Sequence, residues 1–153
     1  MTPREKRVQR VVELRDQRLK LAVRAFEETR ELERKTALEF VRAREARAGA
    51  ERERRALSTG TNGIQAFIEA EEWLRACAAR EDFAAQRLRQ VRAQLEKARA
   101  RLQEALTKLR QLERLAERLA QERRLREDRA ERRLDDEIGQ RFAQSGPRRK
   151  GGV

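Results

Sequence analysis

Two long stretches of this 153-residue chain are almost free of residues that break a helix. From Pro3 to Leu57 the only glycine is Gly49, and no second proline occurs. From Ile64 to Ala143 there is no proline and one glycine. Glycine and proline are the residues that most weaken a helix interior. The sequence therefore predicts an all-α protein with one helix over about 3–57 and a longer one over about 64–143.

Apolar or small residues recur in both stretches at steps of three and four, the spacing by which two helices pair as a coiled coil. The first seam consists of Val12, Leu19, Ala22, Phe26, Thr29, Thr36, Phe40, Ala43, Ala50 and Leu57. The second consists of Leu74, Cys77, Ala84, Leu88, Val91, Leu95, Ala98, Leu102, Ala105, Leu109, Leu112, Ala116 and Leu119. Charged residues interrupt the first seam at Arg15, Glu33, Arg47 and Arg54, the second at Glu81, and its continuation at Arg123 and Arg126.

The segments around the helices contain the expected capping and turn residues. Thr2 and Glu5 flank Pro3 in a capping box at the start of the first helix. Residues 58–63 (STGTNG) form the expected turn, and 144–153 a disordered basic tail. We expect residues 1–143 to form one antiparallel hairpin, folded about residues 60–61.

This fold has two consequences for pairing and length. Folding about residues 60–61 would place Phe40 near Glu81 and Phe26 near Leu95. It would also leave the second helix projecting by about 25 residues, or roughly 35–40 Å, past the start of the first.

Composition excludes several kinds of chemistry. The chain has no histidine and only one cysteine, Cys77, so it can assemble neither an ordinary zinc site nor a histidine-based catalytic triad. Two helices enclose no pocket for a substrate or cofactor, and no phosphate-binding loop is present. We expect a non-enzymatic protein without cofactors. The absence of a signal-like or membrane-spanning segment favours a soluble, intracellular protein.

Charge and aromatic residues are unevenly distributed. The net charge is +12, yet residues 64–82 contain five acidic and two basic residues, whereas 83–133 contain sixteen basic and eight acidic ones. The acidic part also contains Phe67 and Trp73, which either pack over the tip of the hairpin or form a docking patch. Cys77 lies in the seam and is expected to pack as a small core residue. The projecting helix has no partner in its own chain for Leu125, Leu134, Ile138 and Phe142.

Three functional classes were compared on these features. Excess arginine is compatible with non-specific nucleic-acid binding, but interleaved glutamates and scarce aromatic residues favour a solvated helix face. An enzyme is disfavoured for the reasons above. A protein that presents helix faces to partners, as a stalk, an adaptor or a generic scaffold, fits best.

Short motifs near both ends resemble the FliJ family of flagellar export proteins and its injectisome counterpart, the YscO branch. Residues 7–15 (RVQRVVELR) resemble the basic start of the family, and 133–142 (RLDDEIGQRF) resemble its terminal signature. Residues 62–64 lie where some members turn, and residues 73–75 (WLR) resemble the YscO branch.

The resemblance implies a stalk of a type III protein export apparatus, similar to the γ subunit of rotary ATPases. Such a stalk would lie in the bacterial cytoplasm, link the export ATPase hexamer to the cytoplasmic domain of the export-gate protein, promote ATPase assembly and, in some members, handle secretion chaperones. By position, the gate contact would comprise Phe67, Trp73, Cys77 and Arg80. The ATPase contact would comprise Leu134, Asp135, Glu137, Ile138 and Phe142.

Overall fold

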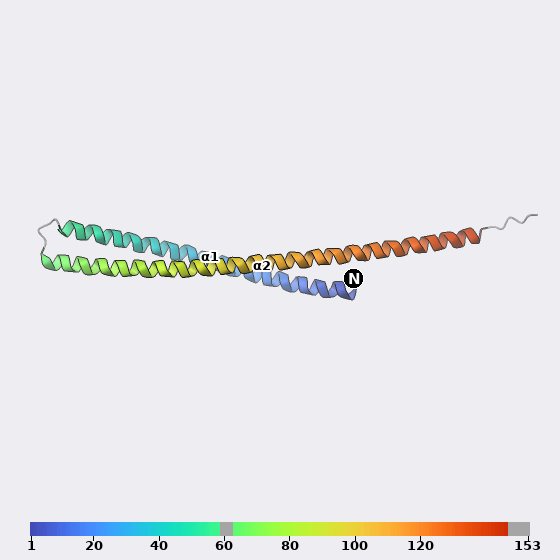
Figure 1. Cartoon of the computed structure of the whole chain (residues 1–153), viewed down its shortest axis with the longest axis horizontal. Coiled ribbons are helices and arrows are strands. Elements are labelled where there is room, and N and C mark those ends of the chain that lie inside the picture. The colour runs from blue at the N-terminus through green and yellow to red at the C-terminus, as the bar shows by residue number, and fades with distance from the viewer. Residues whose placement is uncertain (59–62, 147–153) are drawn as a thin grey trace, which may run out of the picture. The chain divides into compact units, whose positions relative to one another are not determined.

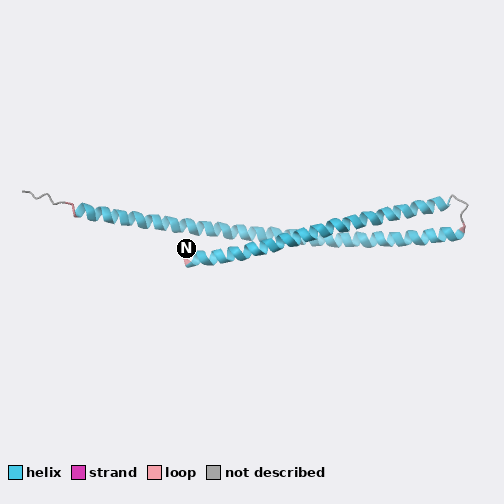
Figure 2. Cartoon of the chain, turned by 180° about the vertical axis from the view of Figure 1, so that it is seen from behind, coloured by secondary structure: helices cyan, strands magenta, loops and turns pink. Residues whose placement is uncertain are grey.

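A computed structural model describes residues 1–58 and 63–146 of the chain. Within these residues the secondary structure is entirely helical, with α1 at Pro3–Ser58 and α2 at Ile64–Gln144 (Figures 1 and 2). This confirms the predicted fold class, two long paired helices of which the second is longer. Ser58, expected in the turn, ends α1; residues 59–62 of that turn and 147–153 of the tail lie outside the described residues.

The start of α1 has the Thr2 half of the predicted capping box, whereas the Glu5 carboxylate pairs with Arg123. The Thr2 hydroxyl oxygen accepts a hydrogen bond from the Glu5 backbone N–H at 3.2 Å. The Thr2 carbonyl accepts another from the Lys6 N–H at 3.0 Å. The Thr2 hydroxyl thus satisfies one backbone donor that a helix N-terminus leaves without a partner, and the bond from Lys6 is the first regular bond of the helix.

The chain divides into two compact units. The hairpin unit, residues 17–107, contains most of α1 and the first half of α2, which run side by side in opposite directions (Figures 1 and 2). The second unit, residues 1–16 with 108–153, contains the start of α1 and the rest of α2. Its most buried residues are Leu109 and Leu119, both on the predicted seam.

The predicted seam is the core of both units. Every seam residue named from the sequence is buried or partly buried, and Ala50, Cys77, Leu88 and Val91 are among the most buried. Thr36 is a buried polar residue, and its hydroxyl donates to the Leu32 carbonyl at 2.7 Å. Because that bond lies within the same helix, Thr36 enters the seam without leaving a polar atom unsatisfied.

Most of the charged residues that interrupt the seam form ion pairs between the helices. In the hairpin unit Arg47 pairs with Glu81 at 3.1 Å. Two further cross-helix pairs of this unit are Arg54–Glu71 at 2.7 Å and Glu33–Arg92 at 3.3 Å. In the second unit Glu5 pairs with Arg123 at 3.0 Å. Opposite charges at matching seam positions favour one alignment of the helices over its neighbours.

The predicted pairing of Phe40 with Glu81 is wrong, because Glu81 contacts Arg47 instead. The physical reason is a stagger at the end of the hairpin. The first turn of α2 extends past the last residue of α1 (Figure 1), and its first side chain, Ile64, is strongly exposed. A given residue of α1 therefore faces a residue of α2 that lies later in the sequence than a fold centred on residues 60–61 predicts.

The stagger also shortens the projecting part of α2. Glu5, in the first turn of α1, lies beside Arg123, and every described residue after Arg123 is exposed. The projecting part is therefore residues 124–144, called here the α2 extension. At 1.5 Å per residue it is about 30 Å long, slightly less than predicted.

Candidate partner-binding surfaces

Trp73 and Arg80 form one surface near the start of α2. They are seven residues apart, two turns of helix, and so lie on the same side. The Arg80 guanidinium carbon lies 5.4 Å from the centre of the Trp73 ring, a cation–π contact. Trp73 is 46% exposed, so the stacked pair presents an oriented aromatic ring to the solvent.

The other two residues assigned to this surface lie elsewhere on the helix. Phe67 is exposed but precedes Trp73 by six residues, which places it on a different side of α2. The Cys77 side chain is 1% exposed and packs in the seam as a free thiol, as its core interpretation predicted. The structure therefore brings Trp73 and Arg80 together and separates both from Phe67, whereas Cys77 lies between them along the helix but is buried in the seam.

The acidic character of this part of α2 is partly neutralised by α1. Glu71 and Glu81 are paired with Arg54 and Arg47. The hydrogen bond from the Arg47 guanidinium to Glu81, together with the charge of that carboxylate, raises the pKa of Arg47. The pairing cancels two of the five negative charges that the sequence places here.

The α2 extension carries the second surface. Leu134, Ile138 and Phe142 follow each other at steps of four, so their side chains form one row along the helix. All three are exposed, and Asp135 and Glu137 lie within one residue of this row in the sequence. The extension thus has an apolar row with acidic neighbours, and no described residue of its own unit covers it.

Leu125 lies on the opposite side of the extension. It precedes Leu134 by nine residues, which is two and a half turns. The exposure of the two leucines is nearly equal, 56% for Leu125 and 57% for Leu134. Leu125 therefore offers a matched control for any variant of the apolar row.

Sequence reasoning missed the ion pairs and the contact between Trp73 and Arg80. In each helix alone the charged seam residues are interruptions, whereas their signs are complementary between the helices. Comparing Glu33, Arg47 and Arg54 with charged residues of α2 for one common alignment could have found the pairs. The spacing of seven between Trp73 and Arg80 was the available signal for the stacking.

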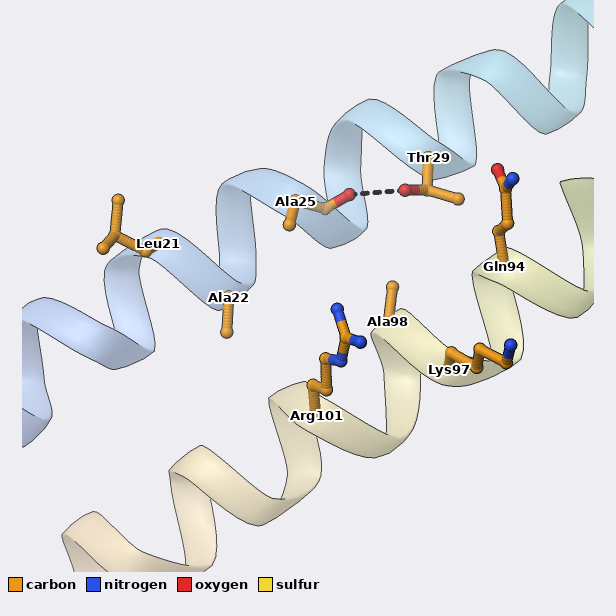
Figure 3. A pocket seen from close by; sticks show the side chains of 8 residues that line it. All are labelled: Leu21, Ala22, Ala25, Thr29, Gln94, Lys97, Ala98 and Arg101. Carbon is orange, nitrogen blue, oxygen red and sulfur yellow. Dashed lines mark hydrogen bonds between the residues drawn. The ribbon is translucent and has the colours of Figure 1, made fainter.

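No cluster of three or more potential metal ligands occurs among residues 1–58 and 63–146. No helix in these ranges is long and apolar enough to cross a membrane. A hollow lined by residues of both α1 and α2 lies between the two helices (Figure 3).

These features define an all-α, two-helix coiled-coil protein whose candidate sites are exposed helix faces. The chain belongs to the FliJ family, because the family model described as "Flagellar FliJ protein" matches residues 4–148. It is therefore a component of the flagellar export apparatus, in a family of non-catalytic proteins. No curated protein and no solved structure gave a significant match.

Proposed function

We propose that this protein is the stalk of the export apparatus and links the export ATPase ring to the cytoplasmic domain of the export-gate protein. In this role it works at the cytoplasmic face of the apparatus and promotes assembly of the ATPase. The α2 extension contacts the ATPase, and the surface of Trp73 and Arg80 contacts the gate.

The observation that carries the proposal is the uncovered apolar row on the α2 extension. Isolated helices of this length are only marginally stable in water, and most gain their stability by packing an apolar face. Leu134, Ile138 and Phe142 are exposed on such a helix. Three aligned large apolar side chains are the kind of anchor that a partner surface buries. In a member of the FliJ family, the export ATPase is the partner that fits this row.

The decisive experiment compares a variant of the apolar row with a control variant on the opposite side of the extension. Leu134→Gln/Ile138→Gln removes the centre of the apolar row, whereas Leu125→Gln removes an equally exposed leucine from the opposite side. We expect the double variant to lose at least ~90% of the stimulation of ATPase turnover, since loss of a buried anchor costs about 2 kcal/mol or more.

The control variant should stimulate the ATPase as the wild-type chain does. Circular dichroism checks that all variants keep the same helix content. Equal stimulation by the double variant and the wild type would show that the row is not the ATPase contact. An equal loss in both variants would assign the effect to general changes of the extension.

A further inference from the structure

The two flanks of the hairpin unit differ. Ion pairs between α1 and α2, including Arg47–Glu81, Arg54–Glu71 and Glu33–Arg92, close one flank. Glu81 and Arg92 lie on the same side of α2, because eleven residues make almost three full turns. Acids and bases on this flank thus satisfy each other within the chain.

The other flank is hollowed between the helices. Near Leu21 and Arg101 a hollow of about 460 Å³ lies between α1 and α2 (Figure 3). A second hollow, of about 310 Å³, lies beside Leu32 and Phe83. Gln94 lines both, so the two are parts of one feature, called here the open groove.

The residues along the open groove have the spacing of a helix-packing surface. Its α2 side is formed by Phe83, Arg87, Gln90, Gln94, Lys97 and Arg101. These positions follow each other at alternating steps of four and three. On α1, Leu21 and Ala25 are four residues apart, and Leu32 follows seven later. Residues at steps of three and four form the surface against which another helix packs in a coiled coil. The spacing along the groove therefore matches that needed to pack a third helix.

Apolar side chains lie among polar ones along the groove. Leu21, Leu32 and Phe83 are all exposed along it. The hydroxyl of Thr29 donates to the Ala25 carbonyl at 2.7 Å, so it is already satisfied within α1 (Figure 3). Apolar side chains of a partner could therefore enter here without stripping water from an unpaired hydroxyl.

The α2 rim of the groove is cationic. Arg87, Lys97 and Arg101 line the two hollows, and neither hollow is lined by an acidic residue. In Figure 3 the Arg101 side chain points toward α1 across the hollow. Among the residues described, none of these three cations has a carboxylate within ion-pairing distance, in contrast to Arg47, Arg54 and Arg92 on the other flank. The rim is thus complementary to an acidic partner.

We propose that the open groove binds an acidic amphipathic helix of a partner protein, turning this part of the hairpin into a three-helix assembly. The bound helix places apolar residues against Leu21, Leu32 and Phe83 and carboxylates beside Arg87, Lys97 and Arg101. Phe83 and Arg101 are eighteen residues apart, so a helix of about five turns, roughly 27 Å, covers the groove. A nucleic acid fits less well, because α1 contributes no cation to the lining of either hollow.

The probe for this proposal is a fluorescent, helix-forming peptide of about eighteen residues with leucines at steps of three and four and glutamates beside them. Its binding to the full-length chain is followed by fluorescence anisotropy. We expect Lys97→Glu/Arg101→Glu to weaken binding about tenfold or more, since these charges face the carboxylates of the peptide.

Arg89→Glu/Arg99→Glu makes the same change of net charge at exposed residues that line neither hollow. This control should leave the affinity within about threefold of wild type, as expected for charges outside a contact. Phe83→Ser tests the apolar part and should also weaken binding about tenfold. Circular dichroism verifies that each variant keeps its helix content.

Several results would overturn the proposal. These are absence of binding, equal losses in the groove and control variants, or equal binding of a peptide with lysines in place of the glutamates. If Lys97→Glu/Arg101→Glu instead abolishes self-association in sedimentation velocity, the occupant is a second copy. If it weakens binding of random duplex DNA but not of the peptide, the groove is a nucleic-acid site.

Discussion

At the scale of single residues, the charged side chains in the seam have a defined structural role. Glu5 and Arg123 are 118 positions apart in sequence and meet at 3.0 Å, with the Glu5 side chain only 9% exposed. A partly buried pair of this kind contributes more to the choice of alignment than to net stability. It holds the start of α1 at one position along α2 and so determines where the α2 extension begins.

Reversing one charge of this pair should loosen the start of α1. Glu5→Arg brings two cations together and also removes a favourable acid from the first turn of a helix. We expect backbone amides of residues 6–12 to exchange about tenfold faster, which corresponds to about 1.4 kcal/mol of local stability. Hydrogen exchange read by mass spectrometry or NMR measures this.

The double variant Glu5→Arg/Arg123→Glu, in which the two charges are swapped, provides the control. It should recover most of the lost protection, with a small deficit left because an arginine now lies in the first turn of α1. If the single and double variants exchange equally fast, the ion pair has no role in holding the start of α1.

At the scale of helices, α2 consists of a supported part and an unsupported part. Up to Arg123 it packs against α1, whereas each of residues 124–144 is exposed. The extension remains helical because it continues an existing helix and need not nucleate one. Folding of the paired part should therefore not depend on it.

This independence can be tested by ending the chain after Arg126. The truncated chain keeps Arg123 and its contact with Glu5, while it loses the apolar row. We expect the free energy of unfolding in urea to change by less than ~0.5 kcal/mol, as for other changes at exposed positions. The helical signal in circular dichroism should fall only in proportion to the number of helical residues removed. A loss of several kcal/mol would contradict the division of α2 into these two parts.

Much of the helical structure could be predicted from sequence, because seam residues recur at fixed steps and few glycines or prolines intervene. Every named seam residue proved buried or partly buried. The alignment of the helices was not predicted, since a seam rich in alanine packs nearly as well after a shift, and the choice depends on pairs such as Arg47 with Glu81. The open groove was missed for the same reason, because it combines residues of two helices and requires their alignment.

At the scale of the whole molecule, the protein has a high density of charge and little apolar surface gathered in one place. The chain is 43% charged with a net charge of +12, and its exposed apolar residues form short rows on helices. Such a molecule can offer several separate contacts to larger partners without a compact core. For a member of the FliJ family, this supports the proposed role as a link between components of the export apparatus.

The most direct test of that role is whether one chain bridges the two partners. The export ATPase is immobilised, and capture of the cytoplasmic domain of the export gate is measured with and without the full-length protein. Trp73→Ala should retain ATPase binding but weaken gate capture by about 2 kcal/mol or more, since an exposed, oriented tryptophan is a typical anchor.

The matched control is Ile68→Ala, at an exposed residue of similar accessibility, 44% against 46%, on another side of α2. It should bridge the partners as the wild type does, whereas Leu134→Gln/Ile138→Gln should bind the gate domain but fail to bring it to the ATPase. Two results would contradict the proposed function. One is capture of the gate domain without this protein, and the other is unchanged capture with both Trp73→Ala and Leu134→Gln/Ile138→Gln.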